Sequence, residues 1–367
     1  MTEAAVVNLF LTLRVLLIGG IFLILPHITR KGLLFGVYVG EALADRATAR
    51  RLVSGWRLGC VIVMVLSLLV GFGISLAGRP VAGNLTGTAT LLLGGLGLYV
   101  RFHSRARGLA LAVTEEQGKK ATAPLVGGEP KGAGLAKLAL GMCFLTSLSV
   151  FIYALVSYVG PWTDRSFIAV MFVPSLNVVF SPFLALLALL TANAKRSVRG
   201  GSGGRSVEAQ HAFRATNANL ISWLALLICG FMAILSVQIV RVRLSESSLG
   251  GDFWLLVGVM ASIVVVFALF NLIRILKRYG QGGALIERGS VDTPLTNGLA
   301  DNVHWVWGLF YVDRDDPSIM VEKRFGIGYT FNYGNRKAVL LLATYLLLFL
   351  GLIALGLFAM LTGGGQP

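Results

Sequence analysis

Apolar residues along this chain gather into eight long stretches separated by polar segments. A tilted helix needs about 17–25 apolar residues to cross the hydrocarbon core of a bilayer, and nearly all of these stretches are that long. The stretches are 6–25, 58–77, 85–100, 138–158, 167–191, 218–240, 253–273 and 338–361. The pattern predicts an all-α polytopic membrane protein with about eight transmembrane helices.

The polar segments alternate between strongly basic and nearly free of basic residues. Lysine and arginine together number 6, 6, 5 and 8 in the segments 26–57, 101–135, 192–217 and 275–337. They number only 1, 1 and 2 in the segments 78–84, 159–166 and 241–252. Because basic loops remain on the cytoplasmic side of a membrane, the four basic segments are predicted to be cytoplasmic and both termini outside. Omitting the short, glycine-rich stretch 85–100 would break this alternation, so it counts as a span.

Composition supports the membrane class and argues against nucleic acid as a partner. Hydrophobic residues make up 56% of the 367 residues and charged residues 13%, with a mean hydropathy of +0.78. A soluble domain carries about 25% charged residues. The net charge of +15 lies in the loops between apolar stretches, where it meets lipid headgroups. The first stretch is expected to stay as an anchor, because Glu3 stands where a signal peptide has basic residues.

The chain divides into a membrane domain, a long basic loop and a last span. Residues 1–274 hold the first seven spans, 275–337 form the loop, and 338–367 hold the last span and a tail. Within the loop, residues 303–335 are a dense run of aromatic, charged and glycine residues, named here the motif module. We predict that it is a small cytoplasmic β-rich module between the seventh and eighth helices, folded as a three-stranded meander.

Strict alternation predicts the last strand of the module over 325–333. Two shorter runs of strand-forming residues, 309–312 and 319–321, precede it. The segment 313–317 between them is rich in aspartate and ends in Pro317, which is typical of a turn. The residues expected on one face of the last strand are Phe325, Ile327, Tyr329, Phe331 and Tyr333.

This aromatic face has two interpretations. It can form a small core within the module, closed by Trp305 and Trp307. It can also lie against the headgroup layer, with Lys323 and Arg324 on lipid phosphates. A three-stranded sheet of this size buries little by itself, so it needs the membrane, another protein or a further strand.

A second alternating segment, 33–40, follows the first span and is expected to supply that strand. Leu33, Phe35, Val37 and Val39 fall on one face, and a helix is expected to begin at Glu41. We predict that 35–39 and 325–333 pack together beneath the membrane. The second and third basic loops, by contrast, have the glycine-rich composition of passive linkers.

The sequence contains no recognisable catalytic, cofactor or metal motif, so no cofactor, no metal and no enzymatic activity are expected. The four histidines lie in separate segments without metal-ligand spacing, and Gly326-Ile327-Gly328 lacks the third glycine of a dinucleotide site. The acidic cluster lacks EF-hand spacing, and we interpret it as a plain turn. Its members are Asp313, Asp315, Asp316 and Glu322. The three cysteines each fall in a span and are interpreted as small packing residues, Cys60, Cys143 and Cys229.

Two polar residues within the spans are candidates for a role inside the membrane. Arg14 lies deep in the first span, where it either extends its charge toward the outer face or pairs with a polar group. The first of these is favoured. Asn177 lies between Pro174 and Pro182, which predict a kinked fifth span that can line a substrate path or serve packing alone.

Part of the module resembles a known family. The residues concerned are Trp307, Gly308, Leu309, Phe310, Tyr311, Asp316, Pro317, Val321, Lys323, Arg324, Gly326, Gly328 and Asn332. In this spacing they resemble a short C-terminal domain of unknown function in bacterial multi-spanning membrane proteins. Phe35 and Gly36 resemble the region after the first span of the same proteins. The family often has an asparagine where Asp313 stands. The architecture is more distantly similar to the immunity proteins of the sporulation-delaying toxin system, which protect the producing cell and relay a signal to a repressor.

The resemblance implies a multi-pass protein of the bacterial inner membrane. Together with the absence of catalytic motifs, it favours a non-enzymatic regulatory, sensing or immunity-type protein that acts through the motif module. A cytoplasmic or membrane protein is the expected partner beside the lipid bilayer. The alternative function is a small-molecule or lipid transporter that uses the kinked fifth span.

Overall fold

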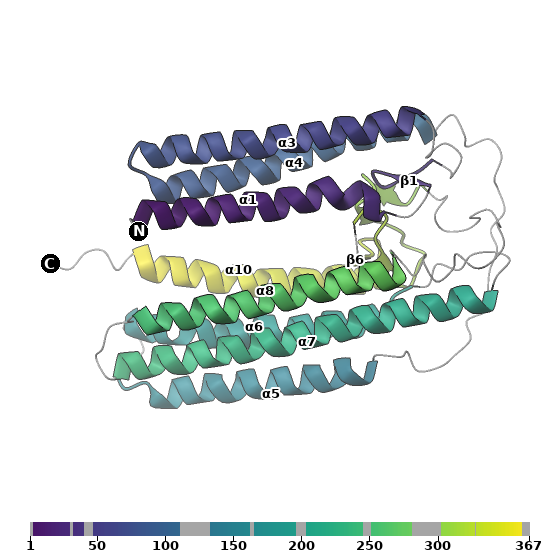
Figure 1. Cartoon of the computed structure of the whole chain (residues 1–367). Helices are drawn as coiled ribbons and strands as arrows, with labels where there is room; N and C mark the ends of the chain where they lie inside the picture. Colours follow the sequence, from purple (N-terminus) through teal and green to yellow (C-terminus); the bar gives the residue numbers. More distant parts are fainter. Residues whose placement is uncertain are drawn as a thin grey trace.

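The computed structural model describes residues 3–29, 32–39, 47–110, 133–161, 165–195, 203–244, 251–280, 302–326 and 328–361. Within these ranges, eight helices are long and apolar enough to cross a membrane, which confirms the predicted number of long apolar helices (Figure 1). They are α1 (Glu3–Ile28), α3 (Ala47–Leu76), α4 (Pro80–Ala110), α5 (Ala133–Ser157), α6 (Arg165–Ala192), α7 (Gly203–Leu244), α8 (Gly251–Tyr279) and α10 (Arg336–Leu361). Large apolar side chains such as Leu93 and Leu347 stand 69% and 70% exposed. Exposed apolar surface of this extent is typical of helices that cross a membrane.

Several helices extend well beyond the apolar stretch that predicts them. The short stretch 85–100 lies inside the 31-residue helix α4, and α7 has 42 residues. At 1.5 Å per residue these helices are about 46 Å and 63 Å long, against a hydrocarbon thickness of about 30 Å. Helix α3 ends in a tight turn where Gly78 adopts φ +80, and Pro80 then begins α4. The third basic segment is therefore partly helical, since α7 begins at Gly203, and it is not the linker expected.

Extensive packing between the described helices falls into two groups. Helices α1, α3 and α4 pack on one another, and α5, α6 and α7 form the second group with α8 on α7 and α10 on α6 (Figure 1). Small residues bring the helices of each group close together. A Cβ added at Gly83 of α4 would lie 2.3 Å from the carbonyl oxygen of Gly71 in α3. In the second group, Ala139, Ala185 and Ala225 meet at the centre of α5, α6 and α7.

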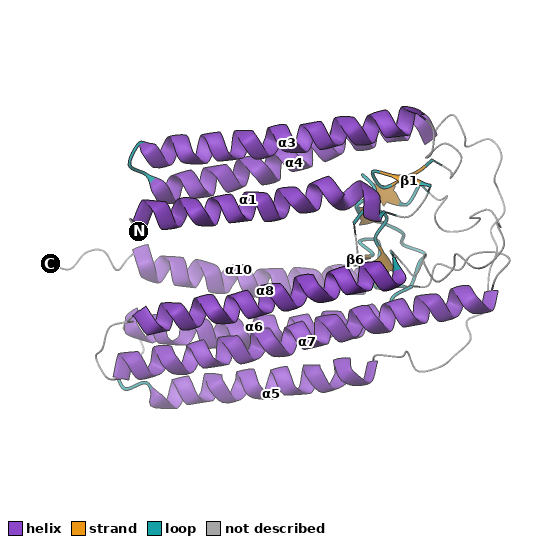
Figure 2. Ribbon diagram, in the orientation of Figure 1, coloured by secondary structure: helices purple, strands orange, loops and turns teal. Residues whose placement is uncertain are grey.

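The strands lie together at one end of the helices, as Figure 2 shows. Helix α1 begins and α10 ends at the opposite end (Figure 1). In the part of the chain that the structure describes, the strands form three antiparallel pairs, β1 with β2, β3 with β4 and β5 with β6. Their bounds are β1 (Leu33–Leu34), β2 (Val37–Tyr38), β3 (Trp305–Val306), β4 (Phe310–Tyr311), β5 (Met320–Glu322) and β6 (Tyr329–Phe331). A parallel bridge between Tyr311 and Asn332 joins the last two pairs.

The strand predictions are right in position but wrong in extent, and the predicted three-stranded meander is wrong. The described part of the module holds two antiparallel pairs, one of which includes the unpredicted strand β3, and β4 is bridged to the end of β6 and not paired with β5. Segment 33–40 is a tight hairpin and not one strand, because Phe35 and Gly36 turn the chain with φ values of 46 and 79. Positive φ at both central residues is the geometry of a type I′ turn. In 325–333, Gly326 and Gly328 also have positive φ, so strand β6 begins only at Tyr329. Within β6 it is Thr330 that is buried, whereas Tyr329 and Phe331 are half-buried. The expected helix start at Glu41 lies outside the described residues.

Candidate functional site

Two turns from opposite ends of the sequence meet beneath the helices. The β1–β2 turn at Gly36 lies against the β3–β4 turn at Gly308, where Trp307 and Gly308 have φ values of 54 and 67. A Cβ added at Gly308 would lie 2.7 Å from Gly36 Cα, and one added at Gly36 would lie 2.8 Å from Gly308 Cα. Both positions therefore need glycine for conformation and for space.

Helix α4 holds the two turns together through its end nearest the strands. The hydroxyl of Tyr99 lies 2.7 Å from the carbonyl oxygen of Trp307 and 3.1 Å from that of Phe35. Nδ1 of His103, one helical turn further, lies 2.8 Å from the same Phe35 oxygen, to which it donates. Two side chains on one face of α4 thus satisfy carbonyl groups of turns that are about 270 residues apart in sequence.

An aromatic cluster surrounds this contact and is the largest buried core at this end. Phe325 of the module packs on Tyr99 and Phe35, with ring centroids 4.7 and 6.1 Å apart. Trp56 of α3 and Phe102 of α4 complete the cluster. Their ring centroids lie 5.3 and 5.4 Å from that of Phe35 and 5.9 Å from each other. Phe35 is 2% exposed and Phe325 7%. The predicted packing of 35–39 against the module is therefore confirmed, and within the last strand segment, 325–333, Phe325 makes this contact.

A polar contact lies beside the cluster and uses Arg324 in an unexpected way. Arg324 is 2% exposed, its guanidinium lies 5.0 Å from the Trp305 ring centre, and its Nη1 donates to Oδ1 of Asn302 at 2.7 Å. Asn302 in turn accepts from the backbone N–H of Tyr38 at 3.2 Å. Arg324 is thus buried inside the module. This contradicts the interpretation in which its guanidinium binds lipid phosphates.

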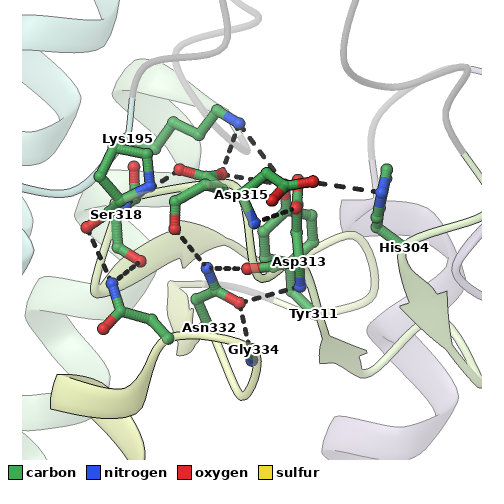
Figure 3. Close-up of polar contacts among 11 residues, drawn as sticks. Lys195, His304, Tyr311, Asp313, Asp315, Ser318, Asn332 and Gly334 are labelled. Carbon is green, nitrogen blue, oxygen red and sulfur yellow. Dashed lines mark hydrogen bonds and ion pairs between the residues drawn. The ribbon is translucent and has the colours of Figure 1, made fainter.

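Asn332 organises the turn between β4 and β5 from the inside (Figure 3). Its side chain is fully buried, and its Nδ2 donates to the carbonyl oxygens of Asp313 and Asp316 at 2.8 and 3.0 Å. Its Oδ1 accepts from the backbone N–H groups of Asp313 and Gly334 at 3.1 and 2.9 Å. These four bonds use the full capacity of the amide. The residue is therefore fixed by the turn, which explains its place in the motif.

The acidic turn also binds the end of helix α6 (Figure 3). Nζ of Lys195, just after α6, lies 2.6 Å from Oδ2 of Asp316, whose side chain is 5% exposed. The Tyr311 hydroxyl lies 2.9 Å from the same oxygen and 3.0 Å from Oδ2 of Asp313. The backbone N–H of Lys195 donates to Met320 in β5 at 2.9 Å. Lys195 is thus an anchor between the second helix group and the module.

The charges of this turn follow from its contacts. Burial alone would raise the pKa of Asp316, but hydrogen bonds from Lys195 and Ser318 outweigh it and hold the pKa below its ordinary value. Burial, and then the adjacent Asp316 carboxylate, raise the pKa of Tyr311 well above its ordinary range. Asp316 is therefore a carboxylate and Tyr311 a neutral hydrogen-bond donor. Among the described residues, no group of three or more His, Cys, Asp or Glu side chains could hold a metal ion.

Helix α7 provides a second contact from the same helix group. The ring of Phe213, on the long end of α7, lies 6.4 Å from the Tyr329 ring in β6. Arg214 beside it is 5% exposed and donates to the carbonyl oxygen of Ala194 at 2.7 Å, next to Lys195. The module is therefore held by α3 and α4 on one side and by α6 and α7 on the other.

The intramembrane candidates are bonded to neighbouring helices. Nη1 of Arg14 donates to Thr88 Oγ1 at 2.8 Å and Asn84 Oδ1 at 3.1 Å, both on α4. An arginine that only extends toward the surface would not make these bonds, so the favoured interpretation is replaced by a polar pairing. Asn177 is fully buried, donates to the Cys229 carbonyl at 3.3 Å and accepts from Ser181. Helix α6 continues through both of its prolines.

Other motif residues lie where the sequence did not place them. Trp307 is 50% exposed and Phe310 37%, so neither closes a core. The cysteines are buried free thiols, and Sγ of Cys229 lies 3.7 Å from the Cys143 carbonyl across α5 and α7. Motif reasoning did not single out Tyr99 or Lys195, two of the residues that connect the module to the helices. Their spacing within spans and loops carries no signal of a contact so distant in sequence.

The comparison with protein families finds one match inside the module. Residues 314–339 match a family of unknown function, DUF5808. The matched segment includes β5, β6, Asp316 and Asn332, and it ends in the first turn of α10. The β3–β4 hairpin with Trp305 and Gly308 precedes it. No curated protein and no solved structure matches this chain.

Proposed function

We propose that this chain is a non-enzymatic regulatory or sensing protein of the bacterial inner membrane, of the immunity type, that acts through the motif module. The proposal places the module in the cytoplasm, since the basic segments lie at that end, and both termini outside. One observation carries it. The module contacts both helix groups at once, through Phe325 and Gly308 on one side and Asp316 on the other.

This arrangement couples the module to the relative position of the two helix groups. A ligand or partner that binds one arrangement of the groups more tightly shifts the population toward it. The module, bonded to both groups, must either follow that shift or release one contact. A protein partner that reads the module would then receive the signal, and the exposed ring of Trp307 is a surface open to such a partner.

Site-specific photo-cross-linking in the native membrane tests this role. A photoreactive residue at exposed Trp307 should capture a discrete protein, and one at Leu93, which is exposed on α4, should capture lipid or nothing discrete. The adduct at 307 should weaken when Asp316→Asn releases the module from Lys195. Equal capture at 307 and 93, unaffected by Asp316→Asn, would contradict the proposal.

Transport through α6 is the second candidate, favoured by one observation. Asn177 and Ser181 form a fully buried polar pair between Pro174 and Pro182 in a spanning helix. Polar residues at this depth are costly and commonly mark transport paths. Small-molecule or lipid flux into proteoliposomes, above a protein-free control and abolished by Asn177→Ala, would favour transport over signalling.

A further inference from the structure

Six exposed arginines lie on the ends of α3 and α4 nearest the strands. We call them the arginine band: Arg50, Arg51, Arg57, Arg101, Arg105 and Arg107. At the other end, the α3–α4 hairpin carries one basic residue, Arg79. The band is therefore a feature of one membrane face, with a charge density that the opposite face does not share.

The lengths of the two helices place the band at the edge of the hydrocarbon. Helix α3 has 30 residues and α4 has 31, about 45 Å each at 1.5 Å per residue. A hydrocarbon core of about 30 Å accommodates the apolar stretches 58–77 and 85–100 but not whole helices. The segments 47–57 and 101–110 thus project about 15 Å beyond it, through a headgroup layer that is about 5–8 Å deep on each side and into the adjoining water.

The arginines continue the apolar faces that lipid must cover. On α4, Leu93, Gly97, Arg101 and Arg105 follow one another at four-residue spacing, and Leu93 is 69% exposed. On α3, Arg57 precedes Val61 and Val65 at the same spacing, and these two are 46% and 49% exposed. A lipid whose chains lie along these faces therefore places its headgroup beside the arginines.

Little in the described structure neutralises this charge. Neither α3 nor α4 contains an aspartate or glutamate. No carboxylate of the described residues forms an ion pair with Arg50, Arg51, Arg101 or Arg107. Arg57 instead contacts the imidazole of His27, and Arg105 lies 5.6 Å from the Phe102 ring centre. Arginines near the headgroups that no described carboxylate neutralises are the pattern that binds lipid phosphates.

We propose that the arginine band is a binding surface for anionic phospholipid headgroups in the leaflet at the module end. The inner sides of the same helix turns carry Trp56 and Phe102, which hold Phe35 and hence the module. Bound phosphates therefore relieve repulsion among the arginines in the turns that position the module. The proposal does not rest on the regulatory role and stands if that role fails.

The test measures lipid affinity of the full-length protein in detergent. Phosphatidylglycerol and phosphatidylcholine are titrated separately, and binding is followed by native mass spectrometry and by melting temperature. The wild type should retain phosphatidylglycerol preferentially, and added salt should weaken this preference. Arg51→Gln with Arg101→Gln should lower phosphatidylglycerol affinity by at least tenfold, at roughly fivefold per arginine.

The matched control removes two exposed arginines outside the band, by Arg79→Gln with Arg314→Gln. It should keep phosphatidylglycerol affinity within about twofold of wild type, because Arg79 is a single arginine at the opposite end of the α3–α4 hairpin and Arg314 lies in the module, so neither contributes to the charge of the band. Melting temperature without added lipid checks that both variants fold. Equal retention of the two lipids by the wild type, or an equal loss in the control pair, would overturn the proposal.

Discussion

Gly308 illustrates how much a single residue decides in this protein. Its backbone has φ +67, and a Cβ would lie 2.7 to 2.9 Å from three backbone atoms of Gly36. Contacts with backbone atoms cannot be relieved by rotating a side chain, so the two turns would have to separate. The same reasoning applies to Gly36, where the Tyr99 hydroxyl is a further obstacle at 2.9 Å.

We therefore expect Gly308→Ala to destabilise the module by about 1–3 kcal/mol, the range of one strained residue. Separation of the Gly36 and Gly308 turns should lower the stability further. The measurement is the melting temperature in detergent, together with protease resistance of the module. Gly97→Ala is the control, because it is exposed in α4 and its Cβ would meet nothing within 4 Å. It should be neutral or slightly stabilising. Equal effects of the two changes would remove the argument for contact between the turns.

Arg14 provides the second residue-scale prediction. Arg14→Leu leaves Asn84 and Thr88 without their charged donor in a low-dielectric setting, so the melting temperature should fall. Arg14→Lys should recover only part of it, since lysine lacks the planar fork. A double-mutant cycle with Asn84→Leu should show an interaction of about 0.5–3 kcal/mol. Strict additivity would return Arg14 to the simpler role of a side chain extended toward the surface.

At the scale of elements, Phe325 and Tyr329 have different partners, although the alternation in the sequence predicted the same face for both. Phe325 and Tyr329 were expected on one face, but Phe325 contacts Tyr99 and Phe35 whereas Tyr329 contacts Phe213 of α7. A charge placed at Phe325, and not at Tyr329, is therefore expected to disturb segment 35–39. The cause is the positive φ at Gly326, which turns the chain between them.

We expect Phe325→Ala to cost about 3–5 kcal/mol, as for a large buried aromatic side chain, and to expose both 33–39 and 305–311 to hydrogen exchange. Tyr329→Ala should cost less and should leave 33–39 protected. Hydrogen-exchange mass spectrometry of the two variants in detergent makes this comparison. If 33–39 lost protection in Tyr329→Ala but not in Phe325→Ala, then Tyr329 and not Phe325 would be the residue that packs on this segment.

The Lys195–Asp316 pair gives the module an acid dependence. The folded pKa of Asp316 is lowered, so its stabilisation is complete above the ordinary aspartate pKa of about 3.9 and is lost as pH falls through the lower folded value. Asp316→Asn should remove about 1.5–3 kcal/mol at neutral pH. The melting temperature, followed from neutral pH downward, should decline less in Asp316→Asn than in wild type below about pH 4. If the melting temperatures of wild type and Asp316→Asn fell equally with pH, the Lys195–Asp316 pair would not be the cause of the acid dependence.

At the scale of the whole molecule, the proposed topology has both termini and the 241–252 loop outside, opposite the strands. A periplasm-active reporter fused at Pro367 or within 241–252 should be active, and one at Gly203 should be inactive. The physical reason is the excess of lysine and arginine in the loops on the strand side. Reporter activity at Gly203 would contradict the proposed topology.

The sequence by itself determined the number of helices and their order. A bilayer demands about 20 apolar residues for each crossing, and this demand is local, so hydropathy is sufficient to find it. It also located the motif module and its turn, because aspartate and proline act on the backbone within a few residues. The same locality explains why Asn332 could be placed in the motif without its four bonds being foreseen.

Only the tertiary structure decided what each motif residue touches. Gly36 and Gly308 each read as an ordinary turn, and their need for glycine arises from a contact across about 270 residues. Arg324 reads as a headgroup ligand until Trp305 and Asn302 are seen around it. Lys195 lies in what reads as a linker, yet it anchors Asp316. Such pairings depend on how the helix groups pack, which no local periodicity encodes.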